Sequence, residues 1–148
     1  MTKRLDLTRF HAVQLVPVTP FGKDGHVNQD ATRQLYERLG KAGIRVFIPC
    51  AGSAEFHALQ VDEILSVIQI AREVLGPEAT IVAPVGFRAE LAVELGNRAC
   101  QLGADAVLVM PLAFPYLSDA GAEDYYRCLL DEMECPVFIY KKGPIPSD

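Results

Sequence analysis

The chain has 148 residues, of which 50% are hydrophobic and 22% are charged, and its formal net charge at pH 7 is −5. This is the length of a single domain, and the apolar content is sufficient for a hydrophobic core, which argues against a disordered chain. Because acidic residues outnumber basic ones and no basic cluster is present, a nucleic-acid partner is not expected.

The amino-terminal residues and the longest apolar run argue against a leader peptide and a membrane span. Lys3 and Arg4 are followed by Asp6 and Arg9, where a signal peptide would have its apolar core. The run 106–117 is uncharged, but it contains two prolines and is too short to cross a bilayer. The four cysteines form no C-x-x-C pair and are too sparse for a disulfide-rich scaffold. We therefore expect a soluble cytoplasmic protein without a membrane partner.

Short runs that are apolar throughout are typical of strands buried on both faces, because half-buried strands alternate between apolar and polar residues. These runs are 12–18, 45–50, 80–85, 106–110 and 136–140. A strand and a helical stretch recur about every 30 residues, which predicts a parallel sheet. Neither a linker nor a low-complexity segment divides the chain, so we expect one domain.

The segments between these runs have the spacing of amphipathic helices, with apolar residues that would form one helical face. The predicted faces are Leu35 and Leu39, then Ile64, Ile68, Ala71 and Leu75, then Leu91, Leu95, Ala99 and Leu102, and finally Tyr126, Leu129, Leu130 and Met133. Asn28 is a favourable amino-terminal cap for the first helix. Glycine stands where helices are expected to end, at Gly43, Gly76 and Gly103.

Two architectures fit this repeat of strand and helix. A doubly wound sheet of five strands would be complete at about this length. A (β/α)8 barrel needs about 250 residues, so residues 1–148 would be the amino-terminal portion of a single barrel domain and supply about its first five strands. Both architectures place ligands at the carboxyl ends of their strands, so the residues that follow each run are the candidate site.

The first two strand ends differ in the chemistry they offer. Residues 18–25 contain neither G-x-G-x-x-G nor G-x-x-x-x-G-K, which argues against a nucleotide phosphate there. After the second run, the small residues Gly52, Ser53 and Ala54 would let a ligand approach the backbone, with a hydroxyl and free N–H groups to hold a carboxylate. A tight turn that leads into a helix would use the same residues, so this alternative stays open.

His57 and Cys50 lie near this turn in the sequence. The spacing of His57 from the other histidines and the cysteines matches no zinc signature, so we expect a surface or hydrogen-bonded histidine and no metal. No partner base is identifiable for Cys50, which we therefore expect to be a small buried residue.

The last two strand ends are apolar and basic, respectively. The loop 110–117 is apolar and contains two prolines, so it suits a pocket wall, a subunit contact or a packed lid equally well. Tyr140 ends the fifth run, where its hydroxyl would lie at the mouth of the sheet. Lys141 and Lys142 would either attract a carboxylate substrate or form an ordinary solvated pair.

These strand ends, in this order, resemble those of the dihydrodipicolinate synthase/N-acetylneuraminate lyase family. The resemblance is carried by residues 19–25, 51–55, 103–111 and 136–140. It extends along all 148 residues of the chain. Within the family, residues 52–56 and 114–117 are nearer to the 5-dehydro-4-deoxyglucarate dehydratase branch.

The resemblance implies a (β/α)8 barrel that forms a Schiff base between a lysine and pyruvate or another 2-oxo acid. It implies that Ser53, with backbone groups of Gly52 and Ala54, binds the substrate carboxylate. It also implies that Tyr140 relays a proton near the reacting carbonyl. The resemblance implies neither a metal nor an organic cofactor, and a homo-oligomer is expected.

The Schiff-base lysine of this family lies on the sixth strand, so the resemblance places it outside this chain. Lys141 and Lys142 do not occupy that position, and a lysine that attacks a carbonyl needs a pKa lowered by burial. We therefore expect the amino-terminal part of a lyase or synthase for a 2-oxo acid, inactive by itself. A dehydratase of sugar acids and a complete, non-catalytic, doubly wound binding domain are the alternatives.

Overall fold

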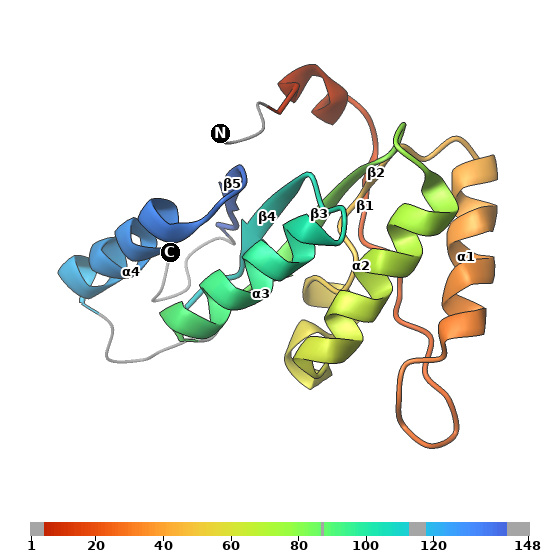
Figure 1. Ribbon diagram of the computed structural model, residues 1–148, viewed down its shortest axis with the longest axis horizontal. Coiled ribbons are helices and arrows are strands. Elements are labelled where there is room, and N and C mark those ends of the chain that lie inside the picture. The colour runs from red at the N-terminus through yellow and green to blue at the C-terminus, as the bar shows by residue number, and fades with distance from the viewer. Residues whose placement is uncertain (1–4, 87, 113–117, 142–148) are drawn as a thin grey trace.

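The computed structural model describes residues 5–86, 88–112 and 118–141 (Figure 1). Within these residues, a five-stranded parallel sheet has the order β1-β2-β3-β4-β5. The strands are β1 (Gln14–Leu15), β2 (Val46–Phe47), β3 (Thr80–Val85), β4 (Ala106–Val109) and β5 (Val137–Ile139). The α-helices are α1 (Gln29–Lys41), α2 (Val61–Leu75), α3 (Ala89–Gln101) and α4 (Asp119–Glu132). Short 3-10 helices are η1 (Leu7–Phe10), η2 (Gly52–Ala54) and η3 (Phe56–Ala58).

The strand order decides between the two predicted architectures. A doubly wound sheet reverses its strand order at a switch point, so that helices cover both of its faces. Here neighbours in the sheet are also neighbours in the sequence, and right-handed crossovers then place every connecting helix on the same side. Helices α1 to α4 follow one another along that side, each in contact with the next (Figure 1). The described residues are therefore part of a (β/α)8 barrel wall, and the doubly wound alternative is wrong.

Local signals set the helix ends as the sequence predicts. The Asn28 side chain accepts a hydrogen bond from the Ala31 N–H at 2.9 Å, which confirms the cap of α1. The φ angles of Gly43, Gly76 and Gly103 are +92°, +68° and +110°, a left-handed range that glycine adopts without strain. These glycines end α1, α2 and α3, and each lies a few residues before the next strand.

The hydrophobic core lies between the sheet and its helices. Every residue of β3 is buried, so the middle strand is covered on both faces as predicted. The predicted face of α2 buries Ile64, Ile68 and Ala71, and that of α3 buries Leu95 and Ala99. The helical spacing in the sequence therefore identifies correctly which sides of α2 and α3 pack inward.

Some residues of the predicted apolar faces of α1, α3 and α4 are less buried than expected. Leu102 is 36% exposed and Leu130 is 53% exposed, because they lie at the end of α3 and on a side of α4 that no described element covers. Helix α1 buries Thr32 and Tyr36 instead of the predicted leucines, which are only partly buried. The ring of Tyr36 packs on Phe47 of β2, with ring centroids 5.7 Å apart.

The two edge strands are shorter and more exposed than predicted. The runs 12–18 and 136–140 reduce to the short strands β1 and β5, and neither strand is fully buried. Val13 and Val18 are each 66% exposed, and Ile139 is 50% exposed. Among the described residues, each edge strand pairs with a neighbour on one side only, so the expectation of burial on both faces is wrong there.

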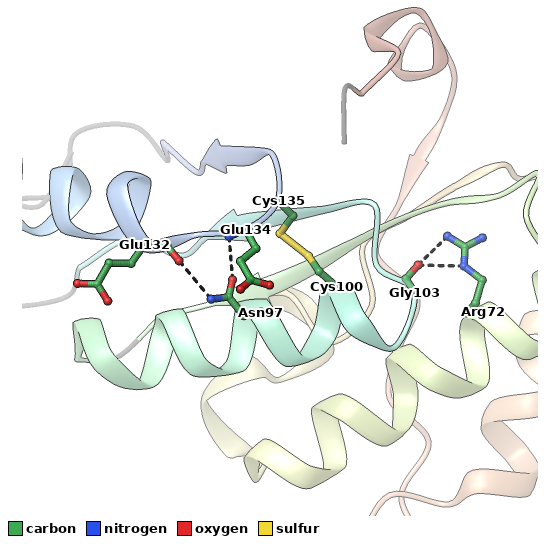
Figure 2. The surroundings of a disulfide bond; sticks show 7 residues. All are labelled: Arg72, Asn97, Cys100, Gly103, Glu132, Glu134 and Cys135. Atoms are coloured by element: carbon green, nitrogen blue, oxygen red, sulfur yellow. Dashed lines mark hydrogen bonds between the residues drawn. A yellow bond between two sulfur atoms is a disulfide. The ribbon is translucent and has the colours of Figure 1, made fainter. Parts of the chain in front are cut away.

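A disulfide joins α3 to the segment before β5 (Figure 2). Cys100 and Cys135 are 35 residues apart in the sequence, and their Cα atoms are 6.6 Å apart. One turn earlier on α3, the Asn97 side chain donates to the Glu132 carbonyl at 3.2 Å and accepts from the Glu134 N–H at 2.9 Å. These contacts fix the chain between α4 and β5 against α3, and this disulfide was not predicted from the sequence.

A partly buried ion pair joins α2 to the strands beside it. The Arg72 guanidinium donates to the Asp105 carboxylate at 2.6 Å. It also donates to the Gly103 carbonyl at 2.8 Å, as Figure 2 shows. Asp105 also accepts from the Ile81 N–H at 3.0 Å. Because both charged groups are paired and hydrogen-bonded, they fix the start of β4 beside β3 at the end of the sheet opposite the candidate site.

Candidate active site

A cavity of about 730 Å³ lies where the chain leaves the carboxyl ends of the strands. Its apolar wall is formed by Val16, Ile48, Leu108, Met110 and Pro111. Its polar side chains are those of Gln14, Ser53, His57 and Tyr140. Gln14 of β1 and Tyr140, which follows β5, both line this cavity although β1 and β5 are the opposite edges of the sheet, so the sheet curves around the cavity.

A second cavity, of about 560 Å³, lies at the opposite end of the sheet, between α1 and α2. Its charged lining consists of Glu37, Lys41, Arg45 and Glu78. In (β/α)8 barrels the amino-terminal face serves stability, whereas active sites form at the carboxyl ends of the strands. The cavity that contains Ser53 is therefore the candidate active site.

The turn after β2 brings Gly52 and Ser53 to the wall of this cavity. Two non-glycine residues with left-handed backbone lie on either side of η2: φ is 58° at Cys50 and 67° at Glu55. Such conformations are unfavourable and persist only where the surrounding structure holds them, commonly at functional sites. The strained backbone thus marks the same turn that the resemblance identifies as a carboxylate site.

Ala54 does not line the cavity, unlike the two residues before it. It is buried, and its N–H already donates to the Ala51 carbonyl at 2.6 Å. Its carbonyl accepts a hydrogen bond from the Thr19 hydroxyl at 2.8 Å. The structure therefore brings Gly52 and Ser53 to the cavity, whereas Ala54 belongs to the support beneath them.

Tyr140 follows β5 and lines the same cavity as Ser53. Its N–H donates to the Val109 carbonyl at 2.9 Å, which continues the pairing of β4 with β5 and fixes the tyrosine backbone. The residue is half-buried, and a phenol is both a donor and an acceptor of hydrogen bonds. The Tyr140 hydroxyl is thus suited to pass a proton to or from a carbonyl group held in the cavity.

The lysines after Tyr140 and the apolar loop after β4 are described only in part. Lys141 is exposed, and no lysine belongs to the cavity lining among the described residues. Lys142 lies outside the described residues. Residues 113–117 of the predicted pocket wall also lie outside the described residues. Met110 and Pro111 of the same loop line the cavity.

Cys50 is the small buried residue that the sequence predicts, with 1% of its surface exposed. Burial raises the pKa of its thiol to about 12, although a hydrogen bond with Thr19 acts in the opposite direction. The thiol is therefore neutral at physiological pH, and a thiolate is the form of cysteine that attacks a substrate. Cys50 is thus a buried residue at the start of the turn, as expected from the sequence.

Gln14 and His57 line the cavity but were not predicted as site residues. Gln14 had a signal in the sequence, because it is the single polar side chain in the run 12–18. His57 is an exposed residue whose ring meets that of Phe56 edge to face, with centroids 5.3 Å apart. Apart from its position next to the turn, no sequence signal identifies it.

The described residues contain neither a metal-ligand cluster nor a helix that could span a membrane. No group of three or more histidine, cysteine, aspartate or glutamate side chains there is placed to hold a metal ion. No helix in this part of the chain is long and apolar enough to cross a membrane.

Comparison with known proteins identifies the family. The model of the dihydrodipicolinate synthetase family matches residues 9–146. The chain belongs to this family. The match confirms the resemblance noted in the sequence and agrees with the partial barrel.

Individual relatives have different activities in their names. "Probable 5-dehydro-4-deoxyglucarate dehydratase 1" from Streptomyces coelicolor is 35% identical over 129 residues, which are 85% of this chain and 40% of the relative. Dihydrodipicolinate synthase from Bacillus clausii has a crystal structure that matches with a TM-score of 0.83 and 34% identity, over 90% of this chain and 45% of that one.

A third relative was solved with a ligand. It is a prophage protein of the same family from E. coli K12 in complex with pyruvate, with 25% identity and a TM-score of 0.79. The match covers 86% of this chain and 43% of that protein. The chain thus spans between 40% and 45% of the length of these relatives.

Proposed function

We propose that the complete protein containing this chain is a Schiff-base-forming lyase or synthase that acts on pyruvate or another 2-oxo acid. The observation that carries the proposal is the meeting of Ser53 and Tyr140 at one cavity, although they follow strands that are not neighbours. Membership of the family and the pyruvate bound to a relative support the same class of substrate.

In this proposal, Ser53 and Gly52 hold the carboxylate of the substrate. Among the described residues, the N–H groups of both have no backbone acceptor, and the Ser53 hydroxyl adds a third donor at the cavity wall. Ala54, which the resemblance also implies, lacks a free N–H and supports the turn instead. A carboxylate fixed in this way presents the neighbouring 2-oxo carbon to an attacking amine.

Tyr140 relays a proton at the reacting carbonyl. When a lysine amine adds to the 2-oxo carbon, the carbonyl oxygen must gain protons before it leaves as water and the imine forms. A positioned hydroxyl that carries those protons typically accelerates such a step by about 10²–10⁴-fold. The amine itself forms the covalent intermediate, so the proposal needs neither a metal nor an organic cofactor.

The Schiff-base lysine belongs to a part of the protein outside this chain. The family has it on the sixth strand, and the sheet described here has β5 at its edge. The 148-residue chain by itself is accordingly inactive in this proposal. The complete enzyme is proposed to be a cytoplasmic homo-oligomer.

A sugar-acid dehydratase similar to 5-dehydro-4-deoxyglucarate dehydratase is the second candidate. Two observations favour it: the 35% identity to the Streptomyces coelicolor relative and the presence of Gln14 and His57 at the cavity. Pyruvate has no polar group beyond its carboxylate and carbonyl, whereas a sugar acid carries further hydroxyl and carboxylate groups. Gln14 and His57 would bind such groups.

Trapping of the imine tests the proposal. The complete protein is incubated with pyruvate, with other 2-oxo acids or with 5-dehydro-4-deoxyglucarate and is then reduced with borohydride. Its intact mass is measured by mass spectrometry. We expect a covalent adduct, and Ser53→Ala should raise the pyruvate concentration needed for half-maximal labelling. If the protein converts the sugar acid to product, whereas pyruvate forms a trapped adduct but is not converted, the result would favour the dehydratase. Absence of an adduct with every acid would contradict both.

A further inference from the structure

The Thr19 side chain connects two segments of the candidate site that are far apart in the sequence. Thr19 lies in the segment that follows β1, and its hydroxyl donates to the Ala54 carbonyl at 2.8 Å across a separation of 35 residues. The residue is partly buried and does not belong to the cavity lining. It therefore contacts the turn without being part of the cavity wall.

The same hydroxyl also acts at the other end of the turn. It lies close enough to the Cys50 thiol, which is buried after β2, to affect the pKa of that thiol. Cys50 and Ala54 flank the residues that line the cavity, Gly52 and Ser53. One side chain thus contacts both the entrance and the exit of the turn.

The backbone of this turn needs such support. Both Cys50 and Glu55 have left-handed φ angles without being glycine, a conformation that L-residues avoid unless neighbouring contacts impose it. Within the turn, the Glu55 N–H donates to the Gly52 carbonyl at 3.1 Å. That short-range bond does not connect the turn to the rest of the barrel wall, whereas the Thr19 hydroxyl does.

We propose that Thr19 is a positioning residue, which holds the turn 50–55 in the strained conformation that presents Ser53 to the cavity. The catalytic consequence rests on the proposed function, in which Ser53 and Gly52 bind the substrate carboxylate. The carboxylate is bound before, during and after imine formation. Loss of the Thr19 hydroxyl therefore weakens substrate binding without slowing the chemical step.

Thr19→Val tests this inference, because it removes the hydroxyl and keeps the shape of the side chain. Thr19→Ser restores the hydroxyl and is the rescue variant. Thr8→Val is the matched control: its hydroxyl is also hydrogen-bonded, to Asp6 at 2.7 Å, but it lies on η1. All three are made in the complete protein and compared with the unaltered one.

The first measurement is amide hydrogen exchange of residues 51–55, which needs no activity. We expect exchange there to accelerate about five- to tenfold in Thr19→Val, as for the loss of one hydrogen bond, and to return to normal in Thr19→Ser. The second is the steady-state rate with the 2-oxo acid that the trapping experiment identifies. KM should rise about five- to tenfold in Thr19→Val while kcat stays within about twofold.

The outcomes separate this inference from the proposed function. If no acid forms an adduct, the proposed function is wrong, and hydrogen exchange alone still decides the role of Thr19. Unchanged hydrogen exchange in the turn of Thr19→Val would overturn the inference. Faster exchange throughout Thr19→Val that persists in Thr19→Ser would also overturn it. A fall in kcat at constant KM would overturn the claim that Thr19 acts through substrate binding.

Discussion

The middle of the sheet and its two edges differ in how completely the chain buries them. Strand β3 has a hydrogen-bonded neighbour on each side, and all of its residues are buried. Strands β1 and β5 each pair on one side only, and Val13 and Ile139 beside or within them are 66% and 50% exposed. The cavity takes Gln14 and Tyr140 from these incomplete edges. The turn 50–55 thus follows β2 inside the buried part of the sheet, whereas the cavity beside it is bounded by the two exposed edges.

Expression of the 148-residue chain alone should reveal the incomplete edges most strongly. Unpaired strand edges bind other strands, and the inner side chains of β1 and β5 lack the layers that fill a closed barrel. We expect aggregated, associated or loosely packed material in size-exclusion chromatography, with a broad thermal transition. A compact monomer with a sharp transition would show that the edges are stable without further strands.

Two leucines on outer helices sharpen the comparison in the complete protein. Leu95 of α3 is fully buried, whereas Leu130 of α4 is 53% exposed. Leu95→Ala should lower the free energy of unfolding by about 2–5 kcal/mol, because it leaves a cavity in the core. Leu130→Ala should cost less than about 1 kcal/mol. Chemical denaturation measures both, and a cost for Leu130→Ala as large as that for Leu95→Ala would mean that further chain or another subunit covers α4.

The disulfide connects the middle of the sheet to one edge. It closes a loop with a sequence separation of 35 residues, for which about 2–4 kcal/mol of stabilisation is typical. Reduction should therefore lower the thermal midpoint of the oxidised complete protein. Cys100→Ser with Cys135→Ser should lower it equally and remove the effect of reductant. Cys128→Ser, at a free cysteine, is the control and should leave the response to reductant intact.

Prediction from the sequence succeeds where structure depends on residues close together in the chain. The Asn28 cap and the glycines after α1, α2 and α3 are local signals, and the structure confirms them. The buried faces of α2 and α3 follow from helical spacing alone. Periodicity did not decide between the barrel and the doubly wound sheet, because strand order depends on contacts between distant segments. The family resemblance supplied the barrel.

The remaining features depend on distances through space. Cys100 and Cys135 have no spacing that predicts a disulfide, and only the packing of α3 against the chain before β5 brings them together. His57 faces the cavity because a short helix follows a strained turn, and no periodic signal reports that geometry. The resemblance did identify Ser53, Gly52 and Tyr140, which line one cavity, although their roles stay predictions.

In the proposed function, Tyr140 carries protons in a Schiff-base reaction whose lysine lies outside this chain. The most direct test is the rate at which pyruvate becomes trapped by borohydride in the complete protein with Tyr140→Phe, which keeps the ring and removes the hydroxyl. We predict a fall of at least about 100-fold, with an unchanged thermal midpoint. Tyr125→Phe, on α4, is the control and should react normally. Trapping at the unaltered rate in Tyr140→Phe would contradict the account.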